Sequence, residues 1–520
     1  MITLALYLFF KIEVMSKVRV RYAPSPTGPQ HVGGLRTALY NYLFAKKLGG
    51  DVILRIEDTD QSRFVEGAED YIINSVKWCG FEFDEGVHKG GNYGPYRQSE
   101  RKDIYKQYCD KLIEQGKAYY AFDTSEELTK ERIKLEQEKK VFKYSFANRI
   151  SMRNSLVLSP EETQKLIQNN TPYTVRFKMN PDEQIVVNDI IRGSVSFNSS
   201  ELDDKIIFKS DGMPTYHLAN IVDDHLMKIS HVIRGEEWLP SAPIHQALYN
   251  AFGWESPKFA HLPLLLKPKG KGKLSKRDGE EGGFPVFPLE WKDPITENIS
   301  TGYKEEGYYS DAFLNIIAFL GWNPGTNQEI FSLNELVETF DITKVGKSGS
   351  KFDPDKAKWF NQQYLWKKSN QQLANELEVD LKKRGIESSV DLISVSVQMR
   401  ERISFVKEIY LTSPYFFESP KDFDLKTIKK KWKERSPQII EGLIKVFENI
   451  EIFKADNIEA EFKNYLEENE LGFGVAMIAI RLAITGLGGG PSLFNIAEII
   501  GKSETIKRLR ESPNIINKLK

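Results

Sequence analysis

The sequence predicts an α/β fold: a parallel sheet with crossover helices, interrupted by an α+β insertion and followed by an all-α C-terminal region. Three observations predict it. A strand, a loop and a helix follow one another over residues 18–47, and a second strand begins at residue 51. Residues 171–208 alternate apolar and polar side chains after charged helical segments. Beyond about residue 340 there are only helical periods and no convincing strand.

Length and composition bound the class of protein. A chain of 520 residues is too long for one hydrophobic core, so we expect two to four domains. Its 40% hydrophobic and 28% charged content is ordinary for a soluble protein, and no apolar run reaches the roughly 20 residues that span a membrane. With a net charge of −1, any nucleic acid must bind local patches. Cys79 and Cys109, with no CxxC pair, favour a reducing, cytoplasmic compartment and argue against a structural zinc.

Residues 1–14 form an apolar segment ahead of the first predicted strand. The segment has no basic start and no small-residue cleavage site, so it does not fit a signal peptide. Met15, just before the strand, is the more natural beginning. We therefore expect residues 1–14 to be a mis-called start or a dispensable extension.

The first strand–loop–helix unit has the features of an anion site. Residues 18–22 alternate apolar and basic side chains as a strand does, and the prolines and glycine that follow force a turn. Apolar residues at helical spacing over 34–47 predict a helix whose N-terminal amides point back at the loop. His31 and Gly33 stand at this mouth, where a His can donate to a phosphate oxygen. The alternative is a solvated His in an ordinary turn, which the loop RYAPSPTG over 21–28 disfavours.

The elements that follow lead to a second, basic loop. Residues 51–60 are predicted to form a strand that ends in acidic residues, among them Glu57, and carboxylates at the carboxyl end of a parallel strand are well placed for a ligand crevice. Residues 267–277 read KPKGKGKLSKR directly after the apolar run 262–266, which predicts a mobile loop at the end of a buried strand. Such a loop can close over a triphosphate and stabilise charge that develops on pyrophosphate. The alternative is a solvated basic face.

RYAPSPTG running into HVGG, and KLSKR far downstream, together resemble the two ATP-binding signatures of class I aminoacyl-tRNA synthetases. The loop ahead of His31 is similar to that of the glutamyl-type members. One departure is Gly34, which stands where the class pattern has a second His. The resemblance implies a Rossmann-type parallel sheet, an α+β insertion that contacts the tRNA acceptor end, and an all-α anticodon-binding region.

The resemblance also implies a division of the chain. The expected segments are the extension 1–14, the first Rossmann half 15–100, the connective insertion 101–208, the second half 209–265, a stem-contact region with the KLSKR loop at 266–340, and the helical anticodon-binding domain 341–520. Residues 279–303, rich in Gly, Pro and Glu, look like an insertion beyond the usual family length. Residues 426–433 are basic with one Trp, and predict either an RNA-facing helix or a solvated one.

Site residues follow from the motif positions. The resemblance implies that ATP is bound by His31, Gly33, Glu237, Leu265, Leu266, Lys273, Ser275 and Lys276, with His31, Lys273 and Lys276 catalytic. It implies that glutamate is bound by Arg21, Ala23, Ser25, Glu57, Tyr216, Asn220 and Arg234. Asp223, Asp224 and His225 are consecutive and cannot all face one ion, so we expect no metal bound by the protein there.

The charges of these residues suit glutamate. Its two carboxylates require two arginines, Arg21 and Arg234, and its ammonium requires one carboxylate, Glu57. Arg234 would discriminate glutamate from glutamine, because a neutral amide would leave a buried charge unpaired. The alternative for Arg234 is a structural ion pair with Glu236 or Glu237.

The activity that the resemblance implies is that of a glutamate–tRNA ligase: a monomer without membrane contact that uses ATP with Mg²⁺, L-glutamate and tRNA-Glu, and that needs tRNA for activation. Three alternatives stay open. A glutaminyl-type enzyme shares the signatures, but its anticodon part is a β-barrel, whereas this tail is predicted to be helical. Shortened relatives that glutamylate a tRNA base lack that part. A catalytically inactive, RNA-binding relative would have no need of both ATP signatures.

Overall fold

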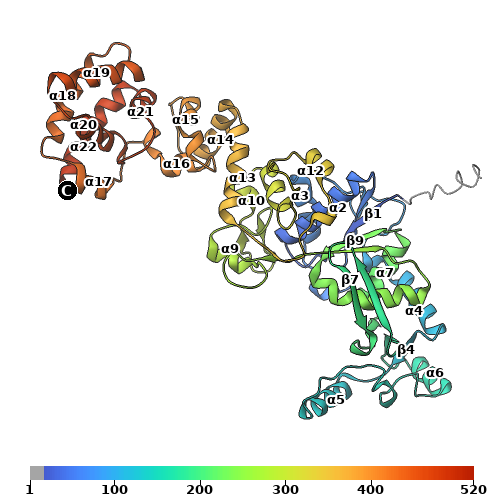
Figure 1. Ribbon diagram of the computed structural model, residues 1–520. Coiled ribbons are helices and arrows are strands. Elements are labelled where there is room, and N and C mark those ends of the chain that lie inside the picture. Colours follow the sequence, from blue (N-terminus) through green and yellow to red (C-terminus); the bar gives the residue numbers. More distant parts are fainter. Residues whose placement is uncertain (1–16) are drawn as a thin grey trace, which may run out of the picture. The chain divides into compact units, whose positions relative to one another are not determined.

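The computed structural model describes residues 17–520, so the expectation for residues 1–14 lies outside the described part of the chain (Figure 1). The chain divides into two compact units. The first runs to Glu306 and resumes over Phe313–Pro354, and the second comprises Gly307–Ala312 and Asp355–Lys520. The finer boundaries expected from the sequence stay predictions. No helix within the described residues has the length and hydrophobicity that a membrane crossing requires.

Parallel strands in two halves form the centre of the first unit. Strands β1, β2 and β3 make one half, and β9, β10 and β6 make the other, with β7 antiparallel to β6. The halves meet where β9 lies beside β1 (Figure 1). There the Ser230 N–H donates to the Arg19 carbonyl oxygen at 2.9 Å. The elements are β1 Arg19–Tyr22, α2 Val32–Lys47, β2 Asp51–Leu54, α3 Ala68–Trp78, β3 Glu85–Gly86, β6 Gln184–Asp189, β7 Gly193–Asn198, α7 Tyr216–Leu226, β9 His231–Gly235, α8 Ala242–Phe252 and β10 Lys258–Leu262.

The insertion between the halves has its own antiparallel sheet, in the order β4-β5-β8. Two charged helices, α5 and α6, lie near β4 (Figure 1). Both begin at capping boxes, in which Thr124 exchanges hydrogen bonds with Glu127 and Ser159 with Glu162. Local polar side chains therefore fix where these exposed helices begin. The elements are α4 Lys102–Glu114, β4 Ala118–Ala121, α5 Ser125–Gln137, α6 Pro160–Gln168, β5 Thr174–Phe177 and β8 Ile206–Phe208.

The segment after β10 departs from the sequence prediction in three places. The expected strand over 262–266 is broken at Pro263, which has no N–H for a ladder, and β11 resumes the extended chain. Strand β14, which we did not expect, pairs with β11 in parallel. The expected loop insertion 279–303 contains a hairpin of β12 and β13. The elements are β11 Leu265–Leu266, α9 Lys276–Gly282, β12 Trp291–Lys292, β13 Ile299–Ser300, α10 Tyr303–Glu306, α11 Ser310–Ala318, α12 Leu333–Thr339 and β14 Ser350–Lys351.

The second unit is helical throughout its described part, which confirms the predicted α/β class with an all-α C-terminal region. Its core is one continuous apolar cluster. Trp432, directly after the basic helix α17, belongs to this core and donates its Nε1–H to Asn517 at 2.8 Å, whereas Leu425 and the lysines of that helix are exposed. The helices are α13 Pro354–Lys367, α14 Asn370–Lys383, α15 Leu392–Met399, α16 Glu408–Thr412, α17 Leu425–Lys431, α18 Ser436–Asn449, α19 Ala455–Glu468, α20 Phe473–Thr485, α21 Leu493–Ile500 and α22 Lys502–Leu519.

Removing residues 355–520 should leave the first unit folded. The core of the helical unit lies between Leu365 and Ile516, so the cut removes that core as a whole, whereas a core cluster of the first unit lies between Ile53 and Phe259 and is kept. We expect the chain 1–354 to unfold cooperatively, with a Tm within about 5 °C of the corresponding transition of the full chain. Scanning calorimetry of both chains measures this. A broad, non-cooperative transition in the shorter chain would contradict the prediction.

Candidate active site

A cavity of about 700 Å³ opens at the carboxyl ends of the first unit's parallel strands. The segments that follow β1, β2 and β9 form its walls, together with the first turns of α2 and α7. This is where open α/β sheets bind ligands. The predicted site residues that line it are Arg21, Ala23, Ser25, His31, Gly33, Glu57, Tyr216, Asn220, Arg234, Glu237, Leu265, Lys273 and Lys276.

Leu266 and Ser275 are the predicted site residues that do not line this cavity. Successive side chains of a strand point to opposite faces, so Leu265 lines the cavity whereas Leu266 lies against the backbone of Gly349. Ser275 begins α9, and its Oγ donates to Asp278 Oδ2 at 2.5 Å. Its hydroxyl therefore holds the helix start that follows the basic loop.

Arg234 is buried and held entirely by uncharged groups. Its Nη1 donates to the Tyr216 hydroxyl at 2.8 Å and its Nε donates to His261 Nε2 at 3.0 Å. His261 in turn contacts Asp189 through Nδ1 at 2.6 Å, which fixes the ring so that Nε2 accepts from Arg234. His245, also buried, approaches Nη1 at 3.3 Å, and burial and then Arg234 itself hold its pKa well below the usual value. The guanidinium is therefore oriented by neutral partners.

No described carboxylate pairs with Arg234. Glu236 and Glu237, the partners in the structural alternative, bind elsewhere. Glu236 forms an ion pair with Arg192, and Glu237 accepts a hydrogen bond from Lys273 at 3.0 Å. The positive charge of Arg234 is thus available to an anion that enters the cavity.

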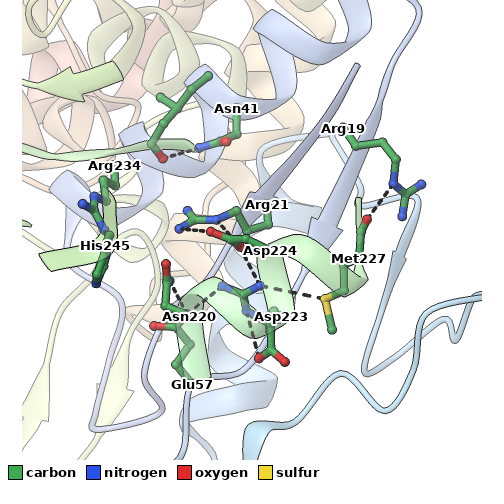
Figure 2. Close-up of polar contacts among 12 residues, drawn as sticks. Arg19, Arg21, Asn41, Glu57, Asn220, Asp223, Asp224, Met227, Arg234 and His245 are labelled. Carbon is green, nitrogen blue, oxygen red and sulfur yellow. Dashed lines mark hydrogen bonds and ion pairs between the residues drawn. The ribbon is translucent and has the colours of Figure 1, made fainter. Parts of the chain in front are cut away.

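Beside Arg234 lies a buried set of ion pairs, which we call the carboxylate–guanidinium cluster. Arg21 Nε donates to Asp224 Oδ1 at 3.0 Å, and Asn220 donates to Glu57 Oε1 at 3.2 Å (Figure 2). Arg55, fully buried, links the two carboxylates, with 2.8 Å to Asp224 Oδ1 and 3.0 Å to Glu57 Oε1. The members of the cluster are Arg21, Arg55, Arg101, Glu57, Asp223 and Asp224.

The two aspartates of the cluster differ in their partners. Asp224 faces the cavity side, where burial opposes its ionisation but Arg21 and Arg55 outweigh burial and hold its pKa below the usual value. Asp223 faces the insertion and accepts from Arg101 Nε at 2.7 Å. The next residue, His225, points away and stacks on Trp254 at 3.8 Å between ring centroids. Across residues 17–520, no group of three or more His, Cys, Asp or Glu side chains is placed to hold a metal ion.

Glu57 has an environment suited to a cation. Burial raises the pKa of its carboxyl, and the nearby guanidinium groups of Arg55 and Arg21 offset only part of that effect. A further positive group in the cavity would favour the ionised form. The carboxylate is therefore positioned to attract an ammonium.

His31 caps the N-terminus of α2 and lines the cavity. Its Nδ1 accepts from the Gly33 N–H at 3.3 Å, so in the neutral ring the proton is on Nε2. Burial, and then Lys273, lower its pKa to about 4, which keeps the ring neutral near pH 7. Nε2 is buried without a hydrogen-bond partner. The Nε2–H group is therefore a donor at the cavity wall that has no acceptor among the described residues.

Sequence reasoning missed several residues of the site. Arg55 had a local signal, because an arginine within the apolar run before Glu57 needs buried carboxylate partners. Trp238, whose ring lies 4.4 Å from that of Tyr216, had none. The cavity wall formed by the hairpin β12–β13 also had no signal in the sequence, because that wall depends on tertiary packing.

Comparisons with known proteins agree with this geometry. Residues 17–359 match the family of tRNA synthetases class I (E and Q), catalytic domain, and residues 362–513 match an anticodon binding domain. The fold and the cavity therefore are those of a class I tRNA synthetase. Glutamate–tRNA ligases from Christiangramia forsetii and Porphyromonas gingivalis are 55% and 52% identical, each over 96% of this chain and 99% of the relative. The chain belongs to the glutamate–tRNA ligase family.

A solved structure supports the same placement. A glutamate tRNA ligase from Elizabethkingia meningosepticum, in complex with its amino acid, is 50% identical with a TM-score of 0.92. The alignment covers 97% of this chain and 100% of that one. The family resemblance inferred from the two ATP-binding signatures is confirmed.

Arg55→Met should destabilise the first unit strongly. The change leaves Glu57 and Asp224 buried with one cation fewer, and breaking a buried ion pair costs about 3–5 kcal/mol in the free energy of unfolding. Arg63→Met is the matched control, because Arg63 is 68% exposed in a surface pair with Asp60 that contributes about 0–1 kcal/mol. Urea denaturation of both variants measures the difference. Equal midpoints would show that the cluster does not depend on Arg55.

Proposed function

We propose that the protein joins L-glutamate to tRNA-Glu within this cavity, in two steps that consume ATP. The observation that carries the proposal is one cavity in which Arg234 lacks a carboxylate partner while Glu57 and His31 present complementary groups. The name of the relatives supports glutamate as the amino acid.

The glutamate subsite is formed by charges of both signs. Glu57 receives the ammonium, and Asn220 steadies Glu57 through a hydrogen bond of 3.2 Å. Arg234 receives a carboxylate, and the Tyr216 hydroxyl keeps the guanidinium in place. Arg21 already donates hydrogen bonds from Nε and Nη2 to Asp224, so we assign the side-chain carboxylate of glutamate to Arg234. A glutamine amide would leave that buried charge uncompensated.

The nucleotide subsite is formed by α2 and the basic loop. His31 donates from Nε2 to a phosphate oxygen, and Gly33 allows the phosphates close to the helix N-terminus. Leu265 contributes an apolar wall for the base. Lys273 and Lys276 approach from the loop and bind the phosphates. Mg²⁺ enters with the triphosphate as part of the substrate.

The chemistry needs no protein nucleophile. The glutamate α-carboxylate attacks the α-phosphorus of ATP in line, the bond to the β-phosphate breaks, and pyrophosphate leaves. A hydroxyl of the terminal tRNA ribose then attacks the carbonyl carbon of the adenylate, loses its proton, and releases AMP. The side chains hold the reactants in line and stabilise charge, which accounts for most catalysis in such transfers.

The tRNA partner uses other parts of the chain. We assign the acceptor end to the insertion with sheet β4-β5-β8, and the anticodon arm to the helical unit, whose sequence matches an anticodon binding domain. We propose a monomer in the cytoplasm. A glutaminyl-type enzyme is disfavoured by the helical second unit, and an inactive relative by the unpartnered His31 Nε2 in the cavity.

ATP–pyrophosphate exchange tests the proposal. The reaction is run with glutamate or glutamine, with and without tRNA-Glu, followed by charging of the tRNA with each labelled amino acid. We expect exchange with glutamate that depends on tRNA, and glutamyl-tRNA as the product. Exchange with glutamine alone would favour the glutaminyl-type enzyme, and no exchange under any condition would favour an inactive relative.

A further inference from the structure

The hairpin β12–β13 lies at the cavity although it has no part in either ATP signature. Four of its residues line the same cavity as His31 and Lys276; these are Trp291, Asp293, Thr296 and Asn298. The segment that contains it was singled out above as an insertion beyond the usual family length. Its position raises the question of what it binds.

The base of the hairpin is fixed to the first unit. The Trp291 ring packs edge-on against Tyr71 of α3, with 5.3 Å between centroids. The Tyr71 hydroxyl donates to the Leu289 carbonyl at 2.5 Å and accepts from the Leu289 N–H at 3.1 Å. Upstream, the carbonyl of Val286 accepts from the N–H of Val32, the first residue of α2, at 2.9 Å. The insertion is therefore attached directly to the helix that begins the nucleotide subsite.

The tip of the hairpin is also ordered by its own contacts. Asp293 Oδ1 accepts from the N–H groups of Ile295 and Thr296 at 2.9 and 2.8 Å. These two amides, and more weakly the nearby Lys276, lower the pKa of Asp293. The backbone N–H of Asp293 donates to the carbonyl of Asn298 at 3.0 Å. The loop thus fixes the backbone of Asn298 at the cavity that Lys276 also lines.

Asn298 offers a free donor in this place. Asn298 is exposed and lines the cavity, and its carboxamide has no hydrogen-bond partner within residues 17–520. An uncharged amide N–H is a good partner for a phosphate oxygen already opposed by lysines. We propose that the hairpin completes the nucleotide subsite and that Asn298 donates to the β- or γ-phosphate of ATP. The inference rests on the proposed ATP-dependent activity.

Asn298→Ala tests the inference, with Ile295→Ala as the matched control. Ile295 sits on the same tip but is 85% exposed and does not line the cavity. Since a hydrogen bond to a charged group is at stake, we expect Asn298→Ala to raise KM for ATP about tenfold and leave KM for glutamate within about twofold. Ile295→Ala should match the parent. A second variant, with residues 293–298 replaced by two glycines, should show the same rise in KM for ATP.

Two inhibitors locate the contact along the nucleotide. We expect Asn298→Ala to weaken inhibition by pyrophosphate about tenfold and to leave inhibition by AMP unchanged. An unchanged KM for ATP, a rise in KM for tRNA alone, or weaker inhibition by AMP alone would each overturn the inference. The parent protein separates this outcome from a failure of the proposed function: if the parent charges tRNA with glutamate and the variants match it, only the hairpin's role is wrong.

Discussion

Arg234→Gln should lower kcat/KM for glutamate by about 30-fold or more, because the change removes a buried charge-assisted pair that is worth about 2–5 kcal/mol. Arg234 is a buried cation to which the described residues offer only neutral hydrogen-bond partners, so its charge is left for the substrate. Glutamine has no side-chain carboxylate to pair with Arg234, so its kcat/KM should fall less, and the ratio of kcat/KM for glutamate to that for glutamine should decrease. Charging of tRNA with each labelled amino acid gives both values.

Arg192→Gln is the matched control for this change. Arg192 lies near Arg234 and contacts the His261 carbonyl, but it pairs with Glu236 and does not line the cavity. We expect the Arg192→Gln variant to prefer glutamate over glutamine by the same ratio as the parent protein. If Arg234→Gln lowers kcat/KM for glutamate and for glutamine by the same factor, Arg234 only maintains structure, and selectivity must come from Arg21 or Tyr216.

Lys276→Ala should slow adenylate formation by about 100- to 1,000-fold, the usual cost of removing one group that stabilises transition-state charge. The Lys276 side chain is 51% exposed, and its nearest carboxylate, that of Glu280, is 3.7 Å away, so the ammonium can move onto the departing pyrophosphate. Its partner charge develops only during the reaction, so the KM for glutamate should change little. Pre-steady-state measurement of adenylate formation reports the step directly.

Arg277, the residue after Lys276, provides the matched control for Lys276→Ala. Arg277 follows Lys276 in α9 but is 85% exposed, pairs with Glu281 and does not line the cavity. Arg277→Ala should therefore keep the parent rate of adenylate formation, although it too removes one positive charge from the start of α9. Equal rates for the parent and Lys276→Ala would remove Lys276 from the mechanism.

Much of the site could be predicted because its residues lie in short contiguous motifs. His31 and Gly33 follow a turn that the prolines dictate, and Lys276 follows a basic loop, so each is read from its neighbours in sequence. The break at Pro263 could also have been predicted, since a proline cannot donate to a ladder. Our strand over 262–266 gave too much weight to apolar character.

The rest could not be predicted because it depends on contacts between distant segments. Arg55 and Asp224 are 2.8 Å apart in space, although Arg55 follows strand β2 and Asp224 lies in helix α7, far along the chain. The hairpin tip reaches the cavity only because Trp291 packs on Tyr71, more than two hundred positions earlier. No period or composition in one segment records such an encounter.

The carboxylate–guanidinium cluster has a consequence for medicinal chemistry. It contains three guanidinium groups and three carboxylates, so it is electrically neutral before any ligand arrives. The unpaired Arg234 beside it then makes the pocket a receptor for a net monoanion at the amino-acid end. An adenylate mimic must therefore retain an acidic side-chain group, such as a carboxylate or a tetrazole, to pair with Arg234. Esterified prodrugs would bind only after the ester is cleaved.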